Sequence, residues 1–265
     1  MNLDYKTINK ALWNKRTESH IDSDFYDNES FMQGRNSLNE IEMEFLTDIK
    51  GKSILHLQCH FGQDSISLAR LGAMVTGADI SDASIKMAEE MAAKMNVPST
   101  FICSDLYELP NVLNQKFDMV FTSYGTIGWL PDVEKWASVV SHFLKPGGHF
   151  VMADFHPVVW MYDDDFKEVT YRYFNAEPII EQSEGSYADT DSPISLPSIG
   201  WNHGMAEILS ALMHNNVQIK TFREYDYSPY PCFRHTEEFA PNKFRIKHFG
   251  DKIPMVYAIV GERNG

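Results

Sequence analysis

The stretch that decides the fold is residues 53–64, Ser53-Ile54-Leu55-His56-Leu57-Gln58-Cys59-His60-Phe61-Gly62-Gln63-Asp64. Its apolar first part predicts a strand over residues 53–57, followed by a tight turn around Gly62 and a helix over residues 65–71. In open α/β sheets, ligands bind beyond the carboxyl ends of the strands, where such a turn presents the backbone N–H groups of the next helix. Functional residues are therefore expected in this turn and in those that follow the other strands.

From this point onward, short apolar runs alternate with helical stretches. Strands are expected over residues 74–78, 100–103, 117–121, 149–153, 217–227 and 255–260, helices over residues 84–95, 133–144 and 205–215, and a turn at residues 145–148. Strands that alternate with helices form parallel sheets. The sequence therefore predicts an α/β fold, a Rossmann-like seven-stranded and mostly parallel sheet with helices on both faces.

Composition divides the chain of 265 residues further, although one domain overall is expected. Residues 154–192 hold ten acidic against two basic side chains, and seven of the 21 residues from 155 to 175 are aromatic. We expect an N-terminal helical lid (1–50), a Rossmann-like core whose strand ends would bind a ligand (51–154), an inserted aromatic and acidic cap (155–200) and a C-terminal part of the core sheet (201–265).

Charge and cysteine content exclude several classes of partner and location. A net charge of −14 disfavours nucleic acid and anionic membrane surfaces. The three cysteines, Cys59, Cys103 and Cys232, lack a CxxC spacing and indicate reduced thiols. With no apolar run of membrane-spanning length and a polar N-terminus, a cytoplasmic monomer or homodimer is expected.

The turns after the later strands carry polar residues at regular positions. Asp79 follows the second strand, 17 residues after Gly62, and Asp105 follows the third. Ser123-Tyr124-Gly125 follows the fourth strand, and Lys145-Pro146-Gly147-Gly148 precedes the fifth. In this order, over roughly residues 40–155, the sequence resembles the class I S-adenosylmethionine-dependent methyltransferases.

The first turn departs from that family's Asp-x-Gly-x-Gly-x-Gly pattern. The matching positions here are His56, Gln58, His60 and Gly62, and the variant Leu-Gln-Cys-His-Phe-Gly-Gln-Asp is similar to one in a bacterial branch, the type 11 and type 25 methyltransferases. Side chains at positions 58 and 60 imply either ordinary negative φ angles or tolerated strain.

The resemblance implies a methyltransferase that uses S-adenosylmethionine and releases S-adenosylhomocysteine. Asp79 would bind the ribose hydroxyls, and Asp105 would accept a hydrogen bond from the adenine amine. The implied cofactor-binding residues are Gln58, Cys59, Gly62, Gln63, Asp79, Ile80, Ser104, Asp105, Leu106, Ser123 and Tyr124.

The aromatic and acidic segments outside the core favour a small-molecule acceptor, methylated on oxygen or nitrogen by direct in-line displacement. Substrate contacts are expected from Tyr26, Trp129, Trp160 and Trp201. His156 and His203 are candidate general bases, and Tyr124 is a candidate orienting residue.

Other interpretations of these residues remain open. Asp79 and Asp105 could instead cap helices, and the aromatic side chains could form core beneath a long loop. His56, Cys59 and His60 could ligate zinc, but they lack a fourth partner at a recognised spacing, so no metal is expected. Alternative functions are a methyltransferase for a lipid, a quinone or a macromolecule, and a non-catalytic cofactor binder. An NAD-dependent oxidoreductase is a distant alternative, because positions 58, 60 and 63 are not glycine.

Overall fold

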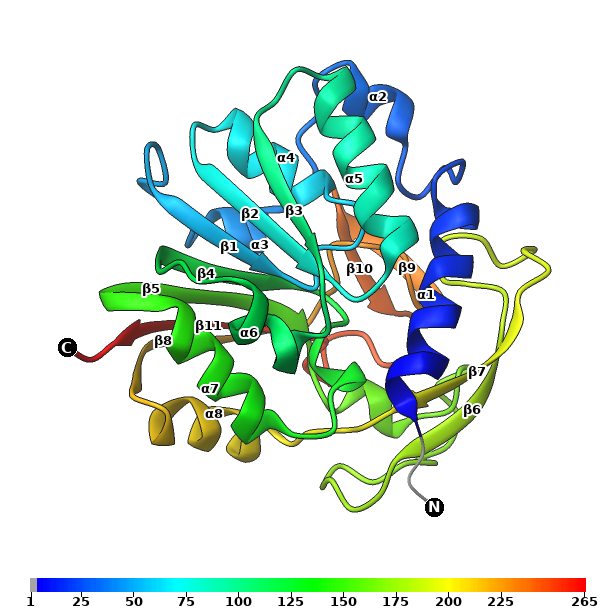
Figure 1. Ribbon diagram of the computed structural model, residues 1–265. Coiled ribbons are helices and arrows are strands. Elements are labelled where there is room, and N and C mark those ends of the chain that lie inside the picture. Colours follow the sequence, from blue (N-terminus) through cyan, green and yellow to red (C-terminus); the bar gives the residue numbers. More distant parts are fainter. Residues whose placement is uncertain (1–3) are drawn as a thin grey trace.

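The protein, described here by a computed structural model over residues 4–265, is built around one seven-stranded sheet. Its strand order is β3-β2-β1-β4-β5-β11-β8, and only β11 runs antiparallel to its neighbours (Figure 1). The prediction of a mostly parallel seven-stranded sheet is therefore confirmed. The strands are β1 (Ser53–Leu57), β2 (Met74–Asp79), β3 (Ser99–Cys103), β4 (Phe117–Ser123), β5 (Leu144–Phe155), β8 (Val217–Tyr225) and β11 (Val256–Arg263).

Helices cover both faces of this sheet, α3, α4 and α5 on one face and α6, α7 and α8 on the other (Figure 1). All five residues of β1 are buried, as expected of a central parallel strand covered on both sides. The helices are α3 (Glu40–Met43), α4 (Gln63–Arg70), α5 (Asp82–Lys94), α6 (Leu109–Val112), α7 (Val133–Phe143) and α8 (Met205–His214).

Helix α7 illustrates how local sequence and packing agree. The Asp132 side chain caps it by accepting a hydrogen bond from Lys135 N at 2.9 Å. Its buried residues recur at helical spacing, and Trp136, the largest, packs edge-on against Phe150 of β5 with ring centroids 5.5 Å apart. The apolar stripe of α7 thereby forms much of the core on this face.

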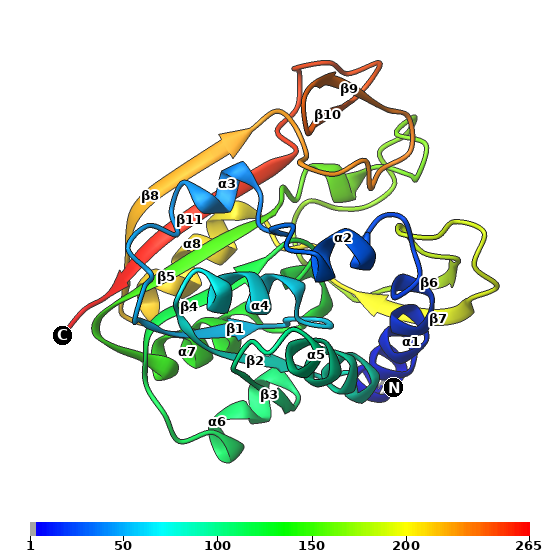
Figure 2. The same ribbon diagram turned by 90° about the horizontal axis from the view of Figure 1, so that it is seen from above.

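Residues 4–50 pack in two places, beside a β-hairpin and on the central sheet. Helix α1 (Tyr5–His20) lies beside the hairpin of β6 (Ile179–Glu184) and β7 (Ser195–Gly200), past the carboxyl ends of the strands (Figure 2). The buried Asn9 side chain joins them, because its Nδ2 donates to Ile199 O at 2.7 Å and its Oδ1 accepts from Ile199 N at 3.0 Å. Residues after α2 (Asn28–Met32) instead return to the sheet, where Leu38, Leu46 and Ile49 join the core.

Two features differ from the prediction. The turn predicted at Lys145-Pro146-Gly147-Gly148 lies within β5 as a bulged, irregular part of its pairing with β4, since Phe117 pairs with Leu144 and Met119 then pairs with His149. The hairpins β6–β7 and β9–β10 (Thr236–Ala240, Lys243–Ile246) were not predicted as strands. Among the described residues no helix is long and apolar enough to cross a bilayer.

Candidate cofactor and acceptor site

A cavity of about 1020 Å³ lies at the carboxyl ends of the central strands, and residues of α1 and of the β6–β7 hairpin also line it. Asp79, Ser123 and Asp154, from the ends of β2, β4 and β5, all line it. Small-molecule pockets usually measure roughly 300–1,000 Å³. This cavity therefore has room for a cofactor and a small second molecule side by side.

The turn after β1, residues 58–62, which we call the motif turn, adopts a strained path that glycine would adopt easily. Gln58 (φ 54°), His60 (φ 49°) and Gly62 (φ 82°) all have left-handed backbone. The two non-glycine residues therefore carry strain, of order 1–3 kcal/mol at each such position. Hydrogen bonds offset it, from Gln58 Nε2 to Thr126 O at 2.9 Å and from His60 N to Asp79 Oδ2 at 2.9 Å.

Asp79 and Asp105 differ in the roles that the structure gives them. Helix α5 is capped by Ser81 rather than by Asp79, whose carboxylate faces the cavity while accepting from His60 N and from Ser81 N. Burial raises the pKa of Asp79. Asp105 does cap a helical turn, by accepting from Tyr107 N at 3.1 Å, and also pairs with Lys6 Nζ of α1 at 2.9 Å.

The structure brings every residue predicted to bind cofactor or substrate to this one cavity. The substrate candidates lie on different walls, since Trp129 stands beside Trp13 of α1, Trp201 beside Tyr5 and Trp160 near the end of β5. The predicted residues that line the cavity are Tyr26, Gln58, Cys59, Gly62, Gln63, Asp79, Ile80, Ser104, Asp105, Leu106, Ser123, Tyr124, Trp129, Trp160 and Trp201.

The two histidines predicted as general bases are outside the cavity lining, so this prediction is corrected. His156 is buried on the side of β8, where its Nε2 lies 3.0 Å from Glu224 Oε1 and its Nδ1 accepts from Val158 N. The fully buried His203 side chain lies 2.7 Å from Leu130 O through Nε2 and 3.2 Å from Glu207 Oε1 through Nδ1. Both side chains fix neighbouring elements rather than face a substrate.

One end of the cavity has aromatic walls. We call Tyr124, Phe155, Trp160, Tyr230 and Phe233 the aromatic chamber. Phe155 lies between its neighbours, with ring centroids 5.6 Å from Tyr124, 5.8 Å from Trp160 and 5.0 Å from Phe233. The edge-to-face contacts of Phe155 with Trp160 and Phe233 help to hold these rings in place.

A buried pair of side chains that the sequence analysis missed lies behind this chamber. Tyr124 Oη donates to Glu42 Oε2 at 2.6 Å, and Glu42 is fully buried. Asn39 donates from its backbone N and its Nδ2 to Glu42 Oε1, at 2.6 and 2.9 Å. Burial raises the pKa of Glu42 to about 7, and the nearby Asp64 contributes in the same direction.

Asp154 sets the turn that presents Tyr124. Its buried carboxylate accepts from the backbone N of Thr126 at 3.1 Å and of Ile127 at 3.2 Å. These bonds hold Tyr124 (φ 32°) and Gly125 (φ 72°) in left-handed backbone. The Tyr124 ring is therefore held in the aromatic chamber, where its centroid lies 5.1 Å from that of Tyr230.

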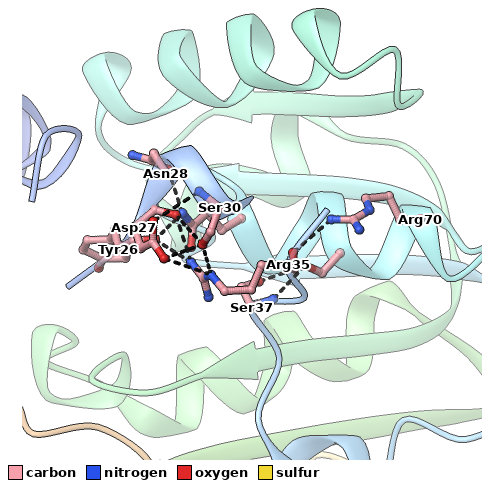
Figure 3. A network of polar contacts seen from close by, with 9 residues as sticks. Tyr26, Asp27, Asn28, Ser30, Arg35, Ser37 and Arg70 are labelled. Atoms are coloured by element: carbon pink, nitrogen blue, oxygen red, sulfur yellow. Dashed lines mark hydrogen bonds and ion pairs between the residues drawn. The ribbon is translucent and has the colours of Figure 1, made fainter. Parts of the chain in front are cut away.

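Residues 25–37, several of which line the cavity, form a segment that we call the strap. Two arginines hold it (Figure 3). Arg35 donates to Tyr26 O at 2.6 Å and to Ser30 Oγ at 2.8 Å. Arg70 of α4 donates in turn to Arg35 O at 3.0 Å. Gln63, predicted to bind cofactor, also donates to Tyr26 O at 2.9 Å, so the strap is fastened to the start of α4.

Two histidines, His20 and His60, join α1 and the inserted segment to the motif turn. His20 Nδ1 lies 3.0 Å from His60 Nε2, and His20 Nε2 lies 3.1 Å from Ser186 Oγ of the inserted segment. Burial is the main cause that lowers the pKa of His20 to about 3 and that of His60 well below its usual value. Both imidazoles are therefore neutral at physiological pH. In residues 4–265 no cluster of three or more His, Cys, Asp or Glu side chains could hold a metal ion.

Comparison with known proteins identifies the fold. Residues 54–148 match a family model described as a methyltransferase domain. The chain is 32% identical over 131 residues to an uncharacterized methyltransferase of Synechocystis sp. and 29% identical over 133 residues to a ubiquinone biosynthesis O-methyltransferase of Chromobacterium violaceum. Each alignment covers 49% of this chain, with 59% and 57% of those proteins, so the chain spans less than two thirds of each relative.

A solved structure extends the similarity to nearly the whole chain. It is a magnesium protoporphyrin IX methyltransferase from Synechocystis with bound S-adenosylhomocysteine, superimposed with a TM-score of 0.56 at 15% identity over 98% of this chain and 100% of that one. At this identity the likeness concerns the fold. Taken with the strand order and the matched domain, it shows that this chain has the fold of the class I S-adenosylmethionine-dependent methyltransferases.

Proposed function

We propose that this protein transfers the methyl group of S-adenosylmethionine to an oxygen or nitrogen atom of a small molecule bound in the aromatic chamber. One observation carries the proposal. The motif turn with Asp79 and the aromatic chamber with Tyr124 line one and the same cavity. A cofactor on one side would therefore face an acceptor on the other.

The residues on the cofactor side fit the adenosyl group and its amino-acid end. Asp79 faces the cavity with its carboxylate, which can accept from ribose hydroxyls. Gln58 Oε1 is buried and has no hydrogen-bond partner among residues 4–265, so it can accept from the ammonium group of the methionine end. These two acceptors support S-adenosylmethionine as the cofactor.

Methyl transfer mainly requires that the protein align the acceptor atom with the methyl group. When bound, S-adenosylmethionine supplies an electrophilic methyl group and departs as a neutral thioether, so the chain itself needs no nucleophile. The strap and the β6–β7 hairpin cover the cavity and exclude water, and the aromatic chamber orients the acceptor.

Tyr124 and Glu42 supply a route for the proton of a hydroxyl acceptor. The acceptor oxygen would give its proton to Tyr124 Oη while Tyr124 passes its own proton to Glu42, 2.6 Å away. The methyl carbon would exchange its bond to sulfur for one to the acceptor oxygen, and the proton would end on Glu42. Glu42 acts through Tyr124, so it is a positioning residue.

A quinone-type acceptor is the second candidate. The matched protein of Chromobacterium violaceum is named as a ubiquinone biosynthesis O-methyltransferase, and a ring with hydroxyl groups would suit the aromatic chamber. A small phenol without a lipid tail would distinguish the two, because only the small-molecule proposal predicts its efficient methylation.

Ligand binding and turnover test the proposed function directly. S-adenosylmethionine and S-adenosylhomocysteine should raise the melting temperature, by the equivalent of about 2.7 kcal/mol at 100 times Kd, and NAD should not. Incubation with phenols and amines should then release S-adenosylhomocysteine. A response to NAD alone would contradict the proposal, and tight binding without turnover on any acceptor would favour the non-catalytic binder.

The Glu42→Gln variant is expected to lower kcat on a hydroxyl acceptor by roughly 100-fold, within the range of general-base effects. Because the pKa of Glu42 is about 7, the wild-type rate should fall as pH decreases below 7 and the carboxylate becomes protonated. The variant should lose this acidic limb, which a pH profile of kcat would reveal.

Glu44→Gln is the matched control. Glu44 lies two residues further on and pairs at the surface with Arg223, so its replacement should leave the profile unchanged. A Glu42→Gln enzyme with wild-type kcat and the same acidic limb would remove the proton route.

A further inference from the structure

Arg16, on α1, is a cavity-lining cation without an anionic partner. None of its nitrogen atoms makes a hydrogen bond or an ion pair within residues 4–265, and its Nε is buried. The other cationic side chains that line the cavity are engaged, Lys6 with Asp105, Arg35 with the strap and Arg234 with Asp164 and Asp165. Arg16 therefore differs from every other lysine or arginine along this cavity.

Two tryptophan rings flank the Arg16 guanidinium, and neither of them carries a charge that could neutralise it. The guanidinium carbon lies 5.2 Å from the centroid of the Trp13 ring and 5.5 Å from that of the Trp129 ring. The titratable groups that support its charge are the phenols of Tyr26 and Tyr187, and no carboxylate is among them. In a chain of net charge −14, a half-buried arginine without a carboxylate indicates that a ligand supplies the anion.

The position of Arg16 relates it to the motif turn. The Trp13 ring lies 5.3 Å from the His60 ring, and His60 N is bonded to Asp79. Trp129, the second ring beside Arg16, is the last residue of a short helical turn whose first neighbour in the chain is Thr126. The backbone oxygen of Thr126 accepts a hydrogen bond from Gln58 of the motif turn. The cavity wall between Asp79 and Thr126 thus carries one unpartnered cation, Arg16, and one unpartnered acceptor, Gln58 Oε1.

A zwitterionic α-amino acid complements this pair, because it offers a carboxylate to the cation and an ammonium group to the acceptor. The amino-acid end of S-adenosylmethionine is such a group and carries the only negative charge of that molecule. Resting on the proposed function, we infer that Arg16 binds the amino-acid carboxylate of the adenosyl cofactor, with Gln58 on its ammonium group. Helix α1 would then contact the cofactor directly.

Two ligands test this assignment without any acceptor. S-adenosylhomocysteine contains the amino-acid end, and 5′-methylthioadenosine lacks it. Calorimetric titration should show that Arg16→Gln lowers the affinity for S-adenosylhomocysteine by roughly 10- to 100-fold, as expected for a lost charge-assisted hydrogen bond. The affinity for methylthioadenosine should change by less than twofold. Arg16→Lys should recover part of the lost affinity.

Arg234→Gln is the matched control, because this cavity-lining arginine already faces carboxylates, and it should leave both affinities unchanged. An equal loss for both ligands in Arg16→Gln would show that Arg16 only supports α1 and would overturn the inference. Unchanged binding of both would also overturn it, and an increased KM for an anionic acceptor would then place the anion on the second substrate. If the wild type bound neither ligand, the proposed function would fail together with the inference.

Discussion

Replacing Asp79 by alanine is expected to lower the affinity for S-adenosylhomocysteine by roughly 100-fold or more, because two ribose hydroxyls would lose a charged acceptor. The carboxylate lines the cavity at the end of β2 and does not cap α5, so ligand binding is the role left to its cavity side. Part of the loss would be indirect, since His60 N would also lose its partner and the motif turn would loosen. Calorimetric titration measures the change in Kd.

Asp82→Ala provides the comparison for this variant. Asp82 lies three residues further on at the exposed start of α5, where it pairs with Lys10 at 2.9 Å and does not line the cavity. Its replacement should leave the affinity within twofold of wild type. Binding by Asp79→Ala with a Kd within a few-fold of wild type would show that the ribose is held elsewhere.

The predictable part of the site follows from the way parallel strands end. Asp79, Asp105 and Ser123 each come directly after or at the end of a strand of the same sheet, so local sequence was enough to place them together. Their distances along the chain did not matter, because the alternating strands and helices return each turn to the same edge. That these residues line one cavity could therefore be predicted from the sequence.

The direction of a side chain at a strand end could not be predicted in the same way. Phe155 and His156 are adjacent, yet Phe155 lines the cavity while His156 turns towards Glu224 of β8. Which of the two faces the cavity depends on β11 and β8, which pair later in the chain on that side of β5. The wrong assignment of a base to His156 came from its residue type and its proximity to the strand end.

Contacts between side chains that are far apart in the sequence were the other part of the site that could not be predicted. Glu42 gave one local signal, the capping box that it forms with Asn39 at the start of α3. Nothing in that signal points to Tyr124, which lies 82 residues further along. The contact exists because residues 38–49 pack back onto the sheet beside β5, which only the assembled core determines.

Gly62→Ala is expected to destabilise the protein by about 2–4 kcal/mol, the sum of a backbone cost and an overpacking cost. Gly62 has φ 82°, which disfavours any side chain, and a Cβ there would lie 2.8 Å from Ala88 Cβ and 2.9 Å from Phe101 Cε1. Ala88 sits on α5 and Phe101 on β3, and both are buried, so neither neighbour can move aside by rotating a flexible side chain. Denaturant unfolding measures the change.

Gly147→Ala separates the two costs. Gly147 has a similar φ of 74° in the β5 bulge, but a Cβ there would meet nothing within 4 Å, so only the backbone cost applies, about 1 kcal/mol. The difference between the two variants therefore measures the close packing of the motif turn against α5 and β3. Equal destabilisation by both would mean that these elements relax around the added methyl group, and that Gly62 is required for its φ angle alone.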